Sequence, residues 1–339
     1  MLHNASLIFW EDFEWIWPSD WGIASIDPHC LQLMAYAKFS GAPITFHESA
    51  NPFWTPKSNL PVFRTNEGLE LPTFAGVVNH LKSLNYSADY NLTPKQQAEV
   101  AAITQLMEEK LYPALLYVFW LDLNNHSQLT CPWFAKQMTF PLNMYYPSKY
   151  RNHAESVMES RFGIQFTDAP DVRSTIETAV HKNAEECLNM LAERLGEENF
   201  LFGQGPSSAD ALLYGYLAPL LKAPFPNPTL QNYLKASNVL LKFVSRVNLT
   251  YFSKVAIEYE KKKASETQTK QNPEDEEEPV NYTRVAVASS VAASAMTAYA
   301  IKSGWFDVAK NIAIQIVGSD DDENEEDDEQ YAAYNERED

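Results

Sequence analysis

The chain has 339 residues, 45% of them hydrophobic, which is enough for two modest domains with cores of their own. Its formal net charge is −19, and much of this charge comes from residues 274–278 (EDEEE) and 320–329 (DDDENEEDDE). Without a basic stripe, a chain this acidic is not expected to bind nucleic acid, whose phosphates would repel it. The three cysteines form no CxxC pair and the histidines show no HxxxH or HxH spacing, so neither a disulfide framework nor a metal site is expected.

The first 88 residues alternate strand and helix signals. FEWIW (13–17) is typical of a strand, and the helix that follows is expected to have Asp27 as its cap, Pro28 in its first turn and Gly41 at its end, with Leu31, Met34, Ala35 and Lys38 at helical spacing. PITFHES predicts the next strand, and two short strands at 61–63 and 69–71 are joined by RTNEG before another helical pattern. This order predicts a small mixed sheet with helices packed on it. We therefore expect an α+β domain of the thioredoxin-like type at residues 1–88.

Strand signals disappear from about residue 93, and residues 89–257 are predicted to form an all-helical domain. Thr93-Pro94-Lys95-Gln96 is a capping box that begins the first long helix, in which Pro113 is the expected site of a kink. A second long helix is expected to end at Gly196, and a third to begin at Ser207. The apolar positions from Leu230 to Val247 predict a fourth.

The third helix begins with a second capping box. Ser207 can accept from the backbone N–H three residues on, and Asp210 can accept from the Ser207 N–H. The surrounding segment NFLFGQGPSSADALLYGYL resembles the buried capping segment of the glutathione transferase C-terminal domain. Together with the order of elements before it, this resemblance implies a two-domain fold of the glutathione-transferase type, in which Ser207 and Asp210 are structural residues.

Such transferases activate the glutathione thiol with a Tyr, Ser or Cys just after the first strand, and the candidates here are Ser19, Ser25 and Cys30. Cys30 lies inside the first helix pattern and is expected to be a packed core thiol. Ser25, placed before a helix, is typical of a cap.

The expected carboxylate-anchoring polar pair is also missing. At that position stands Leu71-Pro72-Thr73, which leaves only Thr73 able to contribute, while Pro61 keeps the position of a structural cis peptide. We therefore predict no catalytic residue, no bound cofactor and no enzymatic activity.

Beyond the helical domain, residues 258–283 are charged and are predicted to be a flexible linker. Residues 284–306 are predicted to be a membrane anchor, because residues 285–301 carry no charge and show no polar face. The residues that define it are Val285, Ala288, Ala292, Ala293 and Ile301, flanked by Arg284 and Lys302. The remaining 307–339 are expected to be an acidic, mostly disordered tail.

Four stretches of the chain resemble the metaxin family: WPSDWGIASIDPHCLQLMAYAKFSGAPITFHESANPF, SADYNLTPKQQAEVAAITQLMEEKLYPALLYVFWLD, MTFPLNMYY and FLFGQGPSSADALLYGYL. The resemblance implies a non-enzymatic subunit of the mitochondrial outer-membrane sorting and assembly machinery that aids protein import and the insertion of β-barrel precursors. It implies a second metaxin and the β-barrel assembly subunit as partners, and N-terminal domains that face the cytosol. Two alternatives stay open: a membrane-tethered glutathione transferase, which would need Ser19 or Ser25 beside Thr73, and an adaptor that links mitochondria to a motor.

Overall fold

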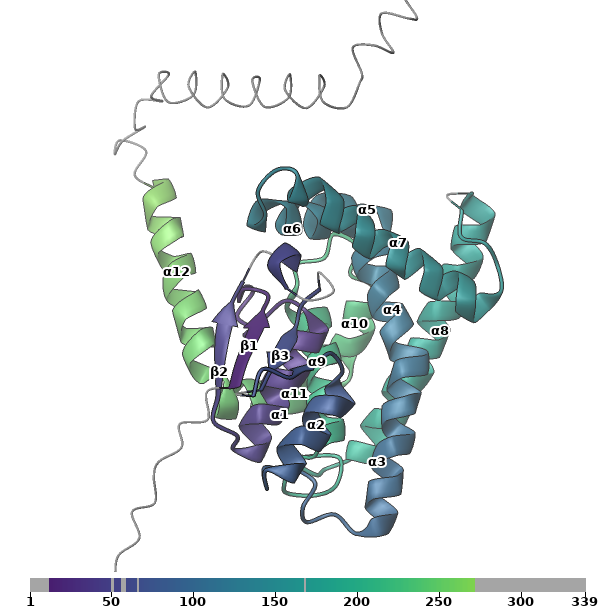
Figure 1. Ribbon diagram of the computed structural model, residues 1–339. Helices are drawn as coiled ribbons and strands as arrows, with labels where there is room; N and C mark the ends of the chain where they lie inside the picture. Colours follow the sequence, from purple (N-terminus) through teal and green to yellow (C-terminus); the bar gives the residue numbers. More distant parts are fainter. Residues whose placement is uncertain (1–11, 50–51, 56–58, 66, 168, 272–339) are drawn as a thin grey trace, which may run out of the picture. The chain divides into compact units, whose positions relative to one another are not determined.

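Figure 1 shows the computed structural model, which describes residues 12–49, 52–55, 59–65, 67–167 and 169–271. The described residues up to Thr269 belong to one compact unit. We call residues 12–83 the α/β part and residues 94–271 the helical part.

The α/β part contains a mixed sheet in the order β2-β1-β3-β4. β1 (Asp12–Ile16) runs parallel to β2 (Ile44–Glu48), while β3 (Val62–Arg64) is antiparallel both to β1 and to β4 (Glu70–Leu71). A short 3₁₀ helix, η1 (Pro52–Trp54), follows β2, and α2 (Phe74–Ser83) follows β4. The predicted order of strand, helix, strand, hairpin and helix is therefore confirmed.

The first helix, α1 (Pro28–Ser40), begins and ends where the sequence predicts. The Asp27 side chain accepts from the Cys30 backbone N–H at 2.8 Å, and Gly41 ends the helix in the left-handed region with φ 70°. All eight residues from Cys30 to Ala37 are buried, so α1 is covered on every side and not on a single face. Lys38 lies in the last turn of α1, as its spacing predicts, and its side chain is exposed.

The helical part begins with one long continuous rod. It consists of α3 (Pro94–Leu106), the π-helical segment η3 (Met107–Leu111), α4 (Tyr112–Leu116) and the π-helical segment η4 (Tyr117–Leu121). Pro113 lies in the first turn of α4, directly after η3. The predicted capping box of Thr93 and Gln96 is present.

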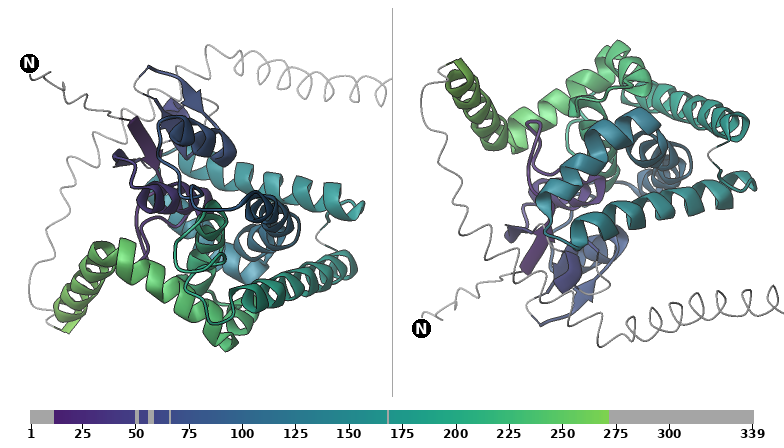
Figure 2. Two further views of the ribbon diagram at one scale, coloured as in Figure 1. Left: turned by 90° about the horizontal axis from the view of Figure 1, so that it is seen from below. Right: turned by 90° about the horizontal axis from the view of Figure 1, so that it is seen from above.

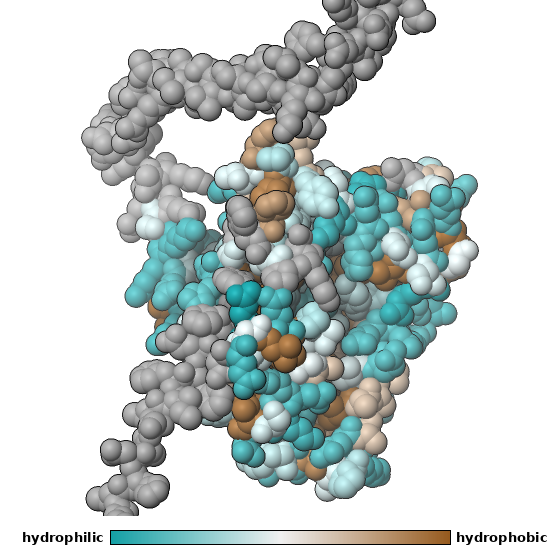
Figure 3. All heavy atoms as spheres, viewed as in Figure 1, coloured by the Kyte–Doolittle hydropathy of each residue, from teal (hydrophilic) through white to brown (hydrophobic). Residues whose placement is uncertain are grey.

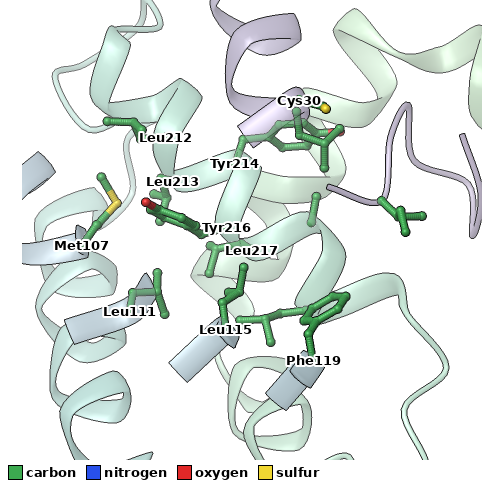
Figure 4. Close-up of a cluster of buried hydrophobic side chains, with 14 of the residues drawn as sticks. Cys30, Met107, Leu111, Leu115, Phe119, Leu212, Leu213, Tyr214, Tyr216 and Leu217 are labelled. Carbon is green, nitrogen blue, oxygen red and sulfur yellow. The ribbon is translucent and has the colours of Figure 1, made fainter. Parts of the chain in front are cut away.

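The core of the helical part is built around α9 (Ser208–Lys222), in which every residue from Ser208 to Leu220 is buried. Figure 4 shows Met107, Leu111, Leu115 and Phe119 following one another along the rod beside α9. The four-residue spacing of these apolar side chains keeps them on one face of the rod.

The remaining helices complete the described chain. They are α5 (Leu123–Asn125), the π-helical η5 (His126–Thr130), α6 (Cys131–Gln137), α7 (Leu142–Phe162), α8 (Pro170–Leu195), α10 (Thr229–Ala236), α11 (Asn238–Tyr251) and α12 (Ser253–Gln271). Both views in Figure 2 place α12 on the opposite side of the helical part from α8.

Two predictions about these helices need correction. The fourth predicted helix is two helices, α10 and α11. They are separated at Ser237, because the backbone of this residue is extended and not helical. The first half of the segment 258–283, predicted as a flexible linker, is helical, because α12 continues to Gln271.

The predicted anchor 284–306 and the predicted tail 307–339 lie outside the described residues. Within the part of the chain that the structure describes, no helix is both long and apolar enough to cross a membrane.

Candidate functional site

The peptide bond between Leu60 and Pro61, just before β3, is cis, as expected for this position.

The three candidates for a thiol-activating group lie in different surroundings. Ser19 is exposed, and its backbone N–H donates to Glu48 Oε1 at 3.2 Å. Ser25 is fully buried, and its hydroxyl accepts from the Asp27 backbone N–H.

Cys30 is fully buried within α1, which confirms its interpretation as a core thiol. Thr73 caps α2, and its hydroxyl oxygen accepts from the Gly76 N–H at 3.2 Å. The one hydroxyl left at the carboxylate-anchoring position is therefore used to satisfy the end of a helix.

Beside the cis peptide, a cavity of about 250 Å³ lies between the α/β part and the helical part. Its inner wall is apolar and buried, and is formed by Trp17, Ile26, Leu115, Leu116, Phe119, Trp120 and Phe134. Polar side chains that are at least partly exposed surround its rim: Asp27, His29, Asn59, Lys149, Tyr150 and His153. The cavity is therefore amphipathic, with an apolar interior and a polar mouth. Among the lining residues that the structure describes, none is Ser19, Ser25, Cys30 or Thr73.

An aromatic cluster holds one side of this cavity in place. The Tyr150 ring lies 5.2 Å from the Trp120 ring and 5.8 Å from the Phe134 ring, between ring centroids. Trp17 meets Phe134 edge to face at 4.9 Å. Tilted and edge-to-face contacts of this kind fix ring orientation, so Tyr150 has a defined position at the rim.

The phenol oxygen of Tyr150 is buried and has no hydrogen-bond partner among the described residues. Burial raises the pKa of Tyr150, with a smaller contribution from Asp27, so the group remains a protonated donor at neutral pH. A buried donor without a partner is costly, which makes this atom a candidate contact for a bound molecule.

The other polar groups of the rim are close enough to influence one another. Lys149 Nζ donates to Asn59 Oδ1 at 2.8 Å, and the Tyr112 hydroxyl lies 3.4 Å from His153 Nε2. Burial lowers the pKa of His153, and the nearby charges of His29 and Lys149 lower it further. The rim thus concentrates potential hydrogen-bond donors and basic groups around one opening.

The predicted capping box at the start of α9 is present and fully buried. The Asp210 carboxylate accepts from the Ser207 N–H at 2.8 Å and from its hydroxyl at 2.6 Å, and a further bond comes from the Leu201 N–H at 2.8 Å. A second carboxylate, that of Asp89, accepts from the Ser208 N–H at 2.8 Å and its hydroxyl at 2.7 Å. Asp89 thereby fastens the segment between the α/β and helical parts to the first turn of α9. No local pattern singles out Asp89, because its partner lies over one hundred residues away.

A third feature is an exposed apolar patch at the turn between α6 and α7. Phe140, Met144 and Tyr145 are 67%, 68% and 59% exposed. Figure 3 shows apolar atoms gathered above this turn on an otherwise mostly hydrophilic face. A cluster of large exposed apolar side chains favours a contact with another molecule.

The described residues contain no group of three His, Cys, Asp or Glu side chains that could hold a metal ion.

Two family models match parts of the chain. The family model of the glutathione S-transferase C-terminal domain matches residues 184–247. The Tom37 family model, described as an outer mitochondrial membrane transport complex protein, matches residues 30–151. Among solved structures, the β-etherase LigF from Sphingobium sp. strain SYK-6 is 14% identical, with a TM-score of 0.49 over 74% of this chain and 99% of its own.

Two curated relatives match most of the chain. Metaxin-1 of Macaca fascicularis is 32% identical over 288 residues, which is 85% of this chain and 89% of the relative. Metaxin-3 of Xenopus laevis is 37% identical over 234 residues, which is 68% of this chain and 74% of the relative.

The mixed sheet, the helical part built on α9 and the matched C-terminal domain define a glutathione-transferase-like fold. The sequence matches to curated relatives also identify the family within this fold. The chain belongs to the metaxin family.

Proposed function

We propose that this protein is a non-enzymatic subunit of the mitochondrial outer-membrane sorting and assembly machinery, where it aids protein import and the insertion of β-barrel precursors. The observation that carries the proposal is the match to metaxins over most of the chain, together with the Tom37 family match at residues 30–151. A second metaxin and the β-barrel assembly subunit are the proposed partners.

The exposed patch of Phe140, Met144 and Tyr145 is the surface that we propose for contact with a partner subunit. The three side chains are close in sequence and each is more than half exposed. Their transfer from water into an interface would be favourable by the usual hydrophobic term. The patch lies at the turn between α6 and α7 and in the first turn of α7.

Affinity purification of the full chain from detergent-solubilised mitochondria tests this function. We expect the β-barrel assembly subunit and a second metaxin to co-purify with the wild type. Met144→Glu should reduce their recovery several-fold, because a charge in the interface core must be desolvated. Met190→Glu is the matched control, since Met190 is a methionine on α8 that is also more than half exposed (52%). Recovery of neither partner, or recovery of motor components in their place, would contradict the proposal.

The non-enzymatic part of the proposal is supported by the surroundings of the candidate groups. Ser25 and Cys30 are fully buried, and the Thr73 hydroxyl caps α2. We therefore expect no measurable glutathione affinity by calorimetry on the full chain. Micromolar binding that Thr73→Ala abolishes would instead favour the tethered transferase.

We further propose that residues 284–306 anchor the protein in the outer membrane, with the domains at residues 1–88 and 89–257 on the cytosolic side. The uncharged run from Val285 to Ile301, flanked by Arg284 and Lys302, supports this assignment.

A further inference from the structure

The cavity between the α/β and helical parts has a composition that selects for a particular kind of small molecule. Its volume, about 250 Å³, approaches the size of sites that hold small organic ligands. Its fully buried lining residues are all apolar, and its polar side chains are all at the partly exposed rim. A ligand that fits must therefore have an apolar body and one polar end.

The interior favours a flat or aromatic body. Three aromatic rings line it. The Phe134 ring lies 4.9 Å from the Trp17 ring and 5.0 Å from the Trp120 ring, between ring centroids. Such rings gain dispersion and quadrupole contacts with an inserted aromatic group, which water in the same space could not supply.

The rim favours a polar end that accepts hydrogen bonds and carries negative charge. The Lys149 ammonium supplies a positive charge there, and the Tyr150 phenol supplies a buried donor that has no partner in the described part of the chain. His29 and His153 can each donate through an imidazole N–H. The carboxylate at the rim, Asp27, is already engaged as the cap of α1 and accepts from the Cys30 N–H. A negatively charged oxygen group at the mouth would pair with Lys149 and satisfy Tyr150.

We propose that this cavity binds an aromatic carboxylate, with the ring system inserted among Trp17, Trp120 and Phe134 and the carboxylate at Tyr150 and Lys149. This binding site is independent of the assembly function proposed above. It requires neither glutathione nor a thiol-activating residue.

Isothermal titration of the purified full chain with naphthalene-2-carboxylate tests the proposal. We expect saturable binding at one site. 2-Naphthalenemethanol has the same ring system without the charge and should bind about tenfold more weakly, because it loses the charge-assisted hydrogen bond. 2-Naphthylmethylammonium should bind more weakly still, because Lys149 repels it. Absence of saturable carboxylate binding, or an alcohol that binds as tightly as the carboxylate, would overturn the proposal.

Two variants connect the binding to the rim. Tyr150→Phe keeps the ring in its aromatic cluster and removes only the unpartnered hydroxyl, so the fold should persist while carboxylate affinity falls about tenfold. Lys149→Gln should lower the affinity by a similar factor. The matched controls are Tyr233→Phe, whose hydroxyl contacts Asn189, and Lys110→Gln, whose ammonium pairs with Glu186, since neither lines the cavity.

Thermal unfolding of each variant establishes that it is folded before binding is measured. If Tyr150→Phe and Lys149→Gln bind the carboxylate as well as their controls do, the molecule occupies another place and the assignment is wrong. Saturable binding of the carboxylate with no effect on the recovery of partner subunits would support this site and leave the assembly proposal untouched.

Discussion

At the scale of single residues, the buried carboxylate of Asp210 sets a pH dependence of stability. Burial raises the pKa of Asp210 from 3.8 to about 6, and this effect outweighs the hydrogen bonds from Leu201 and Ser207, which lower it. The folded chain therefore holds this proton more tightly than the unfolded chain does. The contribution of Asp210 to stability is fully present below pH ~4 and is lost as the pH rises through about 6.

We expect the free energy of unfolding of the wild type, relative to that of Asp210→Asn, to fall by roughly 3 kcal/mol between pH 4 and pH 7. The asparagine variant is the reference because it cannot titrate. Urea unfolding of both full chains across this pH range measures the difference. A difference that grows with pH would mean that the hydrogen bonds to the carboxylate outweigh its burial.

Asp89 provides a check on the same titration. Its charge raises the pKa of Asp210. In an Asp89→Asn background, the decline in stability should therefore occur at lower pH, although the chain also loses the acceptor for the Ser208 N–H and hydroxyl. An unchanged midpoint would show that the two carboxylates do not interact.

At the scale of elements, the contact between α1 and α9 leaves no room for a side chain at Gly215. A Cβ there would lie 2.7 Å from the Pro28 carbonyl oxygen and 3.0 Å from the Gln32 backbone nitrogen. Backbone atoms of a buried helix cannot move aside as the end of a side chain can. The two helices must therefore separate if this glycine is replaced.

Gly215→Ala should lower the free energy of unfolding by about 2 kcal/mol. Overpacking costs ~1–3 kcal/mol, and the better helix propensity of alanine, worth up to ~1 kcal/mol, offsets part of that cost. Gly205→Ala is the control, because a Cβ at that position meets no atom within 4 Å, and it should change stability by less than ~0.5 kcal/mol. Equal effects of the two substitutions in urea unfolding would contradict the close approach of α1 and α9.

Elements with strong local signals could be predicted from the sequence. The bounds of α1 followed from Asp27 and Gly41, and the start of α9 from the capping box at Ser207. In contrast, α7 was not predicted. Its buried residues, Tyr146, Pro147, Ala154 and Met158, recur at helical steps, but they are only four in a helix of 21 residues, and Pro147, a residue that usually breaks a helix, lies inside it. α12 resembled a linker because it is charged, yet Glu, Lys, Ala and Gln are good helix formers.

The cavity could not be predicted for a different reason. Trp17, His29, Asn59 and Tyr150 come from four separate segments, and only the tertiary fold brings them together. The periodicity of apolar residues predicts one helix or strand at a time, and it does not predict which distant segments come together around a cavity. The same holds for Asp89, whose partner Ser208 is far away in the sequence.

At the scale of the whole molecule, the proposed anchor predicts where the protein resides. Residues 285–301 carry no charge, and their Ala and Ser content makes membrane insertion marginal. A central arginine costs ~2.5–3.5 kcal/mol on insertion scales, so Ala293→Arg should release the chain from the membrane. Lys302→Ala should only weaken targeting, since it removes a flanking charge.

Carbonate extraction of isolated mitochondria measures whether the wild type and these two variants are integrated into the membrane. We expect the wild type in the membrane pellet. A wild type that is soluble, or a chain truncated at residue 283 that still pellets, would show that the anchor lies elsewhere. Protease added outside intact mitochondria should digest the N-terminal domains, and their protection would reverse the proposed topology.

The burial of α1 also has a consequence for how the chain is made. The helix is complete at Ser40, but its cover, α9, begins only at Ser208. At translation rates of ~5–20 residues per second, the ribosome needs on the order of ten seconds or longer to produce α9. During that interval the side of α1 that packs against α9 remains open to chaperones. Limited proteolysis of stalled chains measures this: α1 should be cleaved faster in chains that end before α9 than in chains that include it. The domain that emerges first is therefore among the last to acquire its native packing.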